Sequence, residues 1–98
     1  METYVLQGKQ KTHFARDRGS KYRGVTQNGG KWQVLFTIDQ EYIYLCCSSK
    51  ERYAASLYDI SMIQAKGMKA ITNFNYSKAH LLAILYEKSI VAMRKDHV

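Results

Sequence analysis

Hydrophobic and polar residues alternate over residues 31–38, which is the pattern of a β-strand with one buried face. The apolar face carries Trp32, Val34, Phe36 and Ile38. The opposite face carries Lys31, Gln33, Leu35 and Thr37. A sheet of such strands needs a covering layer on its apolar face.

Two shorter patterns flank this strand and predict further strands over 22–27 and 42–46. In the last of these, Ile43 and Leu45 alternate with Tyr42 and Tyr44. Residues suited to positive φ at 28–30 (Asn-Gly-Gly) and a polar turn at 39–41 (Asp-Gln-Glu) separate the strands. The pattern therefore predicts a three-stranded antiparallel meander.

The next segment has helical spacing over 50–66, with Ser48 or Ser49 as the expected N-cap and Gly67 as the stop. One stripe of this helix holds mostly small residues, namely Ala54, Leu57, Tyr58, Ser61 and Ala65. Small side chains allow a helix to approach a sheet closely, so we expect this stripe to cover the apolar face.

A second helix is predicted over 77–94, with a broad apolar arc. The arc holds Leu81, Leu82, Leu85, Tyr86, Ile90 and Met93. It could dock on its own domain, pair with a second copy, or contact another part of a longer protein. The predicted fold class is therefore α+β: a three-stranded antiparallel sheet packed on one α-helix, with an additional C-terminal amphipathic helix.

Length and charge narrow the picture to one basic domain. The chain has 98 residues, a formal net charge of +7 and a pI near 9.5, which favours a polyanionic partner such as nucleic acid or an anionic membrane surface. The excess of positive charge lies in the first 25 residues, which contain six Lys and Arg and two acidic residues. We therefore expect a flexible basic arm over 1–20, a domain over 21–76 and the extra helix over 77–98. A solvated tail or a nuclear-import signal would have the same composition as this arm.

Several other classes find no support in the sequence. No apolar run approaches the roughly 20 residues of a membrane span. The adjacent Cys46 and Cys47 suggest a reduced, intracellular chain. His13, His80 and His97 are scattered without metal-ligand spacing, and neither paired carboxylates nor a phosphate-binding glycine loop occurs. We therefore expect no enzyme activity, no cofactor, no metal and no small-molecule substrate.

Six short motifs in order resemble the AP2/ERF DNA-binding domain over residues 20–76. They are Tyr22-Arg23-Gly24-Val25, Lys31-Trp32, Tyr44-Leu45, Ala54-Ala55 with Tyr58-Asp59, Gly67, and Asn73-Phe74. The composition is similar to that of protist members, including apicomplexan ones. The resemblance implies a nuclear transcription regulator whose sheet enters the major groove of double-stranded DNA, and a groove of that width does admit a β-ribbon.

The resemblance also implies which residues meet the DNA. Base contacts would come from Arg23, Thr26, Asn28, Gln33, Leu35, Thr37, Tyr42 and Tyr44, and backbone contacts from Lys21, Lys31 and Tyr58. Of the arginines that plant members use against guanine, only Arg23 is kept. Leu35 suits a thymine methyl group, and Gln33 or Asn28 suits adenine, so we expect a site richer in A·T pairs.

Two alternatives remain open at this stage. The chain could tether to chromatin or RNA through phosphate contacts alone, with steep salt dependence and little sequence preference. It could also be a protein-interaction or homodimerisation module that acts through the 77–94 helix.

Overall fold

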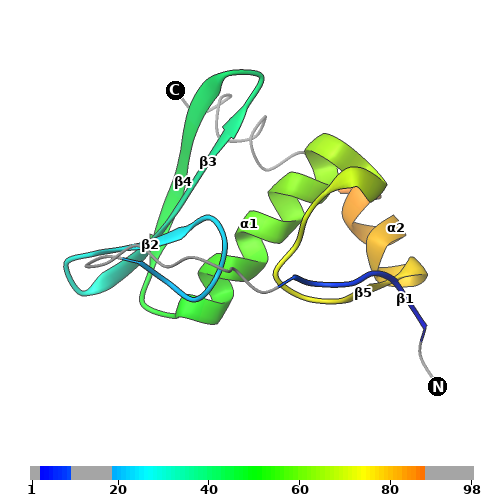
Figure 1. Ribbon diagram of the computed structural model, residues 1–98, viewed down its shortest axis with the longest axis horizontal. Helices are drawn as coiled ribbons and strands as arrows, with labels where there is room; N and C mark the ends of the chain where they lie inside the picture. Colours follow the sequence, from blue (N-terminus) through cyan, green and yellow to red (C-terminus); the bar gives the residue numbers. More distant parts are fainter. Residues whose placement is uncertain (1–2, 10–18, 88–98) are drawn as a thin grey trace.

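The computed structural model describes residues 3–9 and 19–87, and Figure 1 shows their arrangement. A meander of β2 (Val25–Asn28), β3 (Lys31–Ile38) and β4 (Glu41–Ser48) packs against α1 (Glu51–Lys66). The short 3-10 helix η1 (Gly67–Lys69) follows α1. A second, two-stranded sheet pairs β1 (Tyr4–Leu6) with β5 (Tyr76–Ser77), and α2 (Lys78–Tyr86) comes last. The predicted α+β class and the sheet-on-helix arrangement are confirmed.

Both hairpins close through two residues with the backbone angles that such turns need. Gly29 has a φ of 65° in the first, and Asp39 and Gln40 have φ angles of 51° and 65° in the second. Positive φ at these positions matches the right-handed twist of the paired strands. β3 has the predicted bounds, whereas β2 ends and β4 begins one residue closer to its turn than predicted, with Asn28 paired to Lys31 and Ile38 paired to Glu41. β4 also ends two residues later than predicted, at Ser48.

The first strand of the meander is shorter than predicted, because β2 begins at Val25 and not at residue 22. Residues 21–24 form a turn in which the Tyr22 amide donates to the Ser20 hydroxyl at 3.0 Å. Gly24 then takes a φ of 79°, and its position against the Tyr58 ring leaves no room for a Cβ atom. A strand-like sequence is thus bent by its tertiary contacts.

The alternation over β3 and β4 sets the two faces of the sheet as predicted. Val34, Phe36 and Ile43 are buried on the side of α1, and Lys31, Thr37 and Tyr42 are exposed on the other side. The register shifts by one extra residue in β4, because Leu35 pairs with Tyr44 whereas Gln33 pairs with Cys47. This β-bulge bends the strand and strengthens the local twist of the sheet.

Helix α1 is buried on two sides, whereas the sequence predicted one stripe. Ala54, Tyr58 and Ser61 are buried as expected, but Ala65 is exposed. A second buried row, which contains Asp59 and Ile63, faces away from the sheet toward the chain that returns after η1. A single stripe is expected for a helix that packs on a sheet alone. Here α1 packs both on the sheet and on the chain that returns after η1, so two of its sides are buried.

The predicted C-terminal end of α1 is confirmed, and the predicted N-cap is wrong. Gly67 closes the helix with a φ of 57°, and its amide donates to the Ile63 carbonyl. The N-cap is Lys50, not Ser48 or Ser49. The Ser48 hydroxyl accepts instead from the Lys50 amide at 3.1 Å, so it stabilises the turn that leads into the helix.

The prediction of an arm without regular structure over 1–20 is wrong at residues 4–6. There β1 pairs with β5 and places Leu6 in the core. Three consecutive apolar residues carry no alternation, and their partner strand is some 70 positions away, so no local pattern reveals the pairing. Residues 10–18 of the predicted arm lie outside the described residues.

The last helix is shorter than predicted. It begins after Ser77, whose side chain accepts from the His80 amide at 3.2 Å, and it ends at Tyr86. In the described part of the predicted arc, Leu81 is buried in the core, whereas Leu82, Leu85 and Tyr86 are exposed. Ile84, which lies outside the predicted arc, is buried as well. The helix therefore docks on its own domain through one narrow row. The predicted range 88–94 lies outside the described residues.

A buried carboxylate joins these parts. Asp59 lies on α1 with no exposed surface. Its Oδ1 accepts from the Asn73 amide at 2.7 Å and from Asn73 Nδ2 at 3.2 Å. Its Oδ2 accepts from the Phe74 amide at 2.9 Å and from the Tyr76 hydroxyl at 2.8 Å. Burial raises the pKa of Asp59, and the hydrogen bonds from Asn73, Phe74 and Tyr76 offset part of that rise.

Asn73 carries the connection on to the turn before β2. Its Oδ1 accepts from the Arg23 amide at 2.7 Å, and its Nδ2 donates to the Arg23 carbonyl at 3.0 Å. Helix α1, the chain over residues 72–76 and the turn at residues 21–24 are thereby held by a single network. All of its members are paired, as a buried polar network requires.

We predict that Asp59→Asn lowers the free energy of unfolding by about 2–4 kcal/mol, because an amide NH₂ would face donors that it cannot accept from. Urea denaturation followed by circular dichroism measures the change. Asp39→Asn makes the same chemical change at an exposed turn and should alter stability by less than about 0.5 kcal/mol. Equal stability of the two variants would contradict a structural role for Asp59.

Candidate nucleic-acid interface

The sheet brings most of the predicted base-contacting residues onto its side away from α1. We call this side the outer face, and it consists of Thr26, Asn28, Lys31, Gln33, Leu35, Thr37, Tyr42 and Tyr44. The residues face one another in cross-strand pairs: Asn28 with Lys31, Thr26 with Gln33, Leu35 with Tyr44, and Thr37 with Tyr42. Strand register thus converts an alternation in sequence into one continuous surface.

The chemistry of the outer face is polar and aromatic with little charge. Tyr42 is 69% exposed and Tyr44 is 37% exposed. Leu35 and Gln33 are half-buried between the strands. Lys31 alone among the residues of the outer face is charged. Amide, hydroxyl and methyl groups can contact base edges, and a face with a single cation adds little electrostatic attraction to phosphates, so its chemistry is compatible with base readout.

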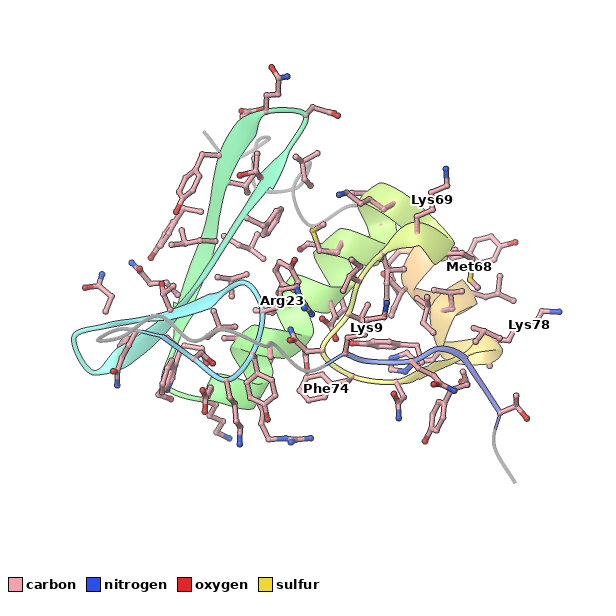
Figure 2. The ribbon with its side chains drawn as sticks, viewed as in Figure 1. Lys9, Arg23, Met68, Lys69, Phe74 and Lys78 are labelled. Carbon is pink, nitrogen blue, oxygen red and sulfur yellow. The ribbon has the colours of Figure 1, made fainter. Side chains whose placement is uncertain are left out.

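Arg23 stands apart from the outer face, which corrects its expected place in the first strand. It lies in the turn before β2, with its backbone held by Asn73. Its Nη1 donates to the Lys9 carbonyl at 3.1 Å. Figure 2 shows Arg23 and Lys9 near each other at the centre of the view, beside β2. Arg23 is half-buried, so its guanidinium is held but still reaches solvent.

The three predicted backbone contacts have different surroundings. Lys31 is exposed next to the Gly29-Gly30 turn. Lys21 is exposed, with its Nζ 5.3 Å from the centroid of the Tyr22 ring. Tyr58 is only 7% exposed, and its ring packs edge-on against Phe36 with centroids 5.8 Å apart. We therefore assign Tyr58 to the core and leave it out of the interface.

A cation–aromatic cluster near the start of α1 was not predicted. The Arg52 guanidinium lies 4.9 Å from the centroid of the Phe74 ring and donates to the Tyr22 hydroxyl at 3.2 Å. Tyr22 and Phe74 pack with centroids 5.3 Å apart. Tyr22 and Phe74 both belong to the quoted motifs, but their spacing of 52 residues gave no indication that one arginine joins them.

Within residues 3–9 and 19–87, no three His, Cys, Asp or Glu side chains gather into a possible metal site. Among the same residues, no helix combines the length and apolarity needed to cross a bilayer.

No protein-family model matches the sequence. The sequence is, however, similar to individual proteins. AP2-like ethylene-responsive transcription factor PLT2 of Arabidopsis thaliana is 36% identical over 75 residues, or 72% of this chain. AP2-like ethylene-responsive transcription factor At1g16060 of the same plant is 36% identical over 60% of the chain. AP2/ERF and B3 domain-containing transcription repressor TEM1, also of Arabidopsis thaliana, is 32% identical over 80% of the chain.

These relatives are much longer than the shared region. The chain spans 13% of PLT2, 18% of At1g16060 and 24% of TEM1. All three are named as transcription factors or repressors and none as an enzyme. Together with the sheet-on-helix fold, the similarity supports an AP2-type domain in this chain.

Proposed function

We propose that this chain is the sequence-specific, double-stranded DNA-binding domain of a nuclear transcription regulator, and that its outer face enters the major groove. The observation that carries the proposal is the outer face itself. It gathers neutral hydrogen-bonding, aromatic and methyl groups from all three strands in register. The similarity to proteins named as AP2-like transcription factors supports the same conclusion.

The shape of the sheet fits this use. Figure 1 shows the β3–β4 hairpin projecting away from α1 and α2, so neither of these helices covers the outer face of this two-stranded ribbon. The major groove is about 12 Å wide and admits such a ribbon. Tyr42, Tyr44, Leu35 and Thr37 lie on the projecting hairpin, so they would enter first.

The distribution of charge suggests that different residues contact the phosphates and the bases. Lys31 and Lys21 lie at the margins of the sheet, where they would meet the DNA backbone. The formal net charge of +7 adds attraction that does not depend on sequence. Among residues 19–87, Arg23 is the arginine placed to contact guanine, and the neutral groups of the outer face favour adenine and thymine.

A second role is carried by a separate observation on α2. Leu82 and Leu85 are each 44% exposed and Tyr86 is 88% exposed. This surface would suit a second copy of the chain, and a dimer would bind two half-sites with increased affinity. The affiliation with protist members stays a prediction, and the relatives named above are plant proteins.

We predict that selection from a randomised duplex pool at near-physiological salt returns a motif of several base pairs that is rich in A·T. The reason is the small number of arginines available to guanine and the methyl-binding and amide groups of the outer face. Sequencing of the enriched pool gives the preference at each position. A paired or palindromic motif would indicate that two copies bind together.

Two outcomes of the selection would count against the proposal. Appreciable binding without enrichment would favour tethering through phosphates alone. A motif made only of G·C pairs would contradict the assignment of Leu35, Gln33 and Asn28 to adenine and thymine.

We predict that Arg23→Ala weakens binding to the selected motif by about 1–3 kcal/mol and relaxes the preference at one base position, because a guanidinium contact to a base edge is lost. Fluorescence anisotropy on the motif and its single-base variants measures both effects. Lys69→Ala removes the same charge at a site that Figure 2 shows well apart from Arg23. This control should leave every base preference intact, and an Arg23→Ala variant with the same profile as the control would contradict the assignment.

A further inference from the structure

The chain before the sheet is fixed to the rest of the domain at several points. We call residues 6–9 the N-terminal segment. Leu6 is buried in the core, the Gly8 amide donates to Asn75 Oδ1 at 2.8 Å, and the Lys9 amide donates to the Thr72 carbonyl at 2.9 Å. Gly8 lies against the Asn73 backbone so closely that a Cβ atom would overlap the Asn73 carbonyl. These contacts fix the position of the N-terminal segment relative to residues 72–75.

The last residue of the segment, Lys9, contacts Arg23. The Lys9 carbonyl accepts from Arg23 Nη1 at 3.1 Å, while the Asn73 side chain holds the amide and the carbonyl of Arg23. Three groups of one arginine are therefore held by two partners, and both partners depend on the chain at residues 72–75. Figure 2 shows the segment, Lys9 and Arg23 in this order along the domain.

We infer that the N-terminal segment and Asn73 are positioning elements for Arg23: they set the direction in which its guanidinium meets the DNA. The inference rests on the proposed function, because it concerns the same interface. It adds that residues outside the sheet help to determine base preference. Asn73 belongs to one of the quoted motifs, whereas the N-terminal segment lies before all of them.

The contact with Lys9 leaves Arg23 able to bind a base. A guanidinium has five N–H donors, and the Lys9 carbonyl takes one of them. A bidentate contact to guanine needs two donors, so enough remain. A long side chain that is already held loses less conformational entropy when it binds. Because its orientation is fixed, it also binds incorrectly placed base edges less well.

The two parts of Lys9 have separate roles. Its carbonyl orients Arg23, and its exposed ammonium is free to approach a phosphate. A side-chain substitution at Lys9 removes the ammonium and keeps the carbonyl in place. This separation allows a positioning effect to be distinguished from a change in charge.

The experiment measures base preference and salt dependence for full-length variants on the selected motif. Gly8→Ala displaces the N-terminal segment and Asn73→Ala releases the Arg23 backbone. We expect both to reduce the preference at the base position that Arg23→Ala relaxes, by about three- to tenfold, and to leave the other positions unchanged. Lys9→Ala should instead weaken all sequences alike and reduce the slope of log affinity against log salt by about 1.

Two controls remove the effect of stability. Gln7→Ala changes an exposed neighbour of Gly8 and should behave as the wild type. Ile84→Val weakens the core at α2, far along the chain from Arg23, and should keep every base preference at temperatures where the chain is folded. A loss of the Arg23-dependent preference in Ile84→Val would overturn the inference, because destabilisation alone would then explain the effect.

A measurement without DNA tests the same contact if a variant does not fold. In the wild-type chain, NMR of the Arg23 guanidinium should show restricted motion, and a freely rotating group would overturn the inference. Selection of a motif with an unaltered Arg23 position in both Gly8→Ala and Asn73→Ala would also overturn it. By contrast, a wild-type chain that selects no motif would overturn the proposed function, so the two failures are distinguishable.

Discussion

One buried carboxylate holds together the parts of this domain that are far apart in sequence. Asp59 accepts four hydrogen bonds from residues 73–76, and Asn73 passes the connection on to Arg23. A charge without exposed surface is costly unless every lone pair finds a donor, so the returning chain is held to a single position on α1. The turn before β2 and the path of residues 6–9 both depend on that position.

The position of α1 determines what the sheet can do. The helix covers Val34, Phe36 and Ile43, which removes the apolar face from solvent and leaves the outer face open. Strand pairing then aligns Leu35 with Tyr44 and Thr37 with Tyr42. Because these groups carry no charge, long-range attraction to phosphate would come mainly from cations such as Lys21 and Lys31. Under the proposed function, the outer face would then contact bases and these cations the DNA backbone.

The elements outside the sheet and α1 complete the fold on the second side of that helix. Leu6 from β1, Tyr76 from β5, and Leu81 and Ile84 from α2 join the same core cluster as the sheet residues. The two-stranded sheet is too short to be stable alone, so it depends on this packing. The domain therefore includes the chain on both sides of the region that carries the family motifs, and the N-terminal part ends next to Arg23.

The amino-acid sequence determined the features that depend on neighbours along the chain. A period of two specified the strands and their faces, residues tolerant of positive φ specified the turns, and Gly67 specified the end of α1. Those local patterns sufficed to predict the part of the outer face on β3 and β4, from Lys31 to Tyr44, whereas Thr26 and Asn28 were expected there from the family resemblance. The tertiary structure decided the pairing of β1 with β5, the second buried side of α1, the early end of α2, the burial of Tyr58 and the surroundings of Arg23. Each of these depends on contacts between residues far apart in sequence, such as Arg23 with Asn73, whose partners are selected by packing and by the need to pair every buried polar group.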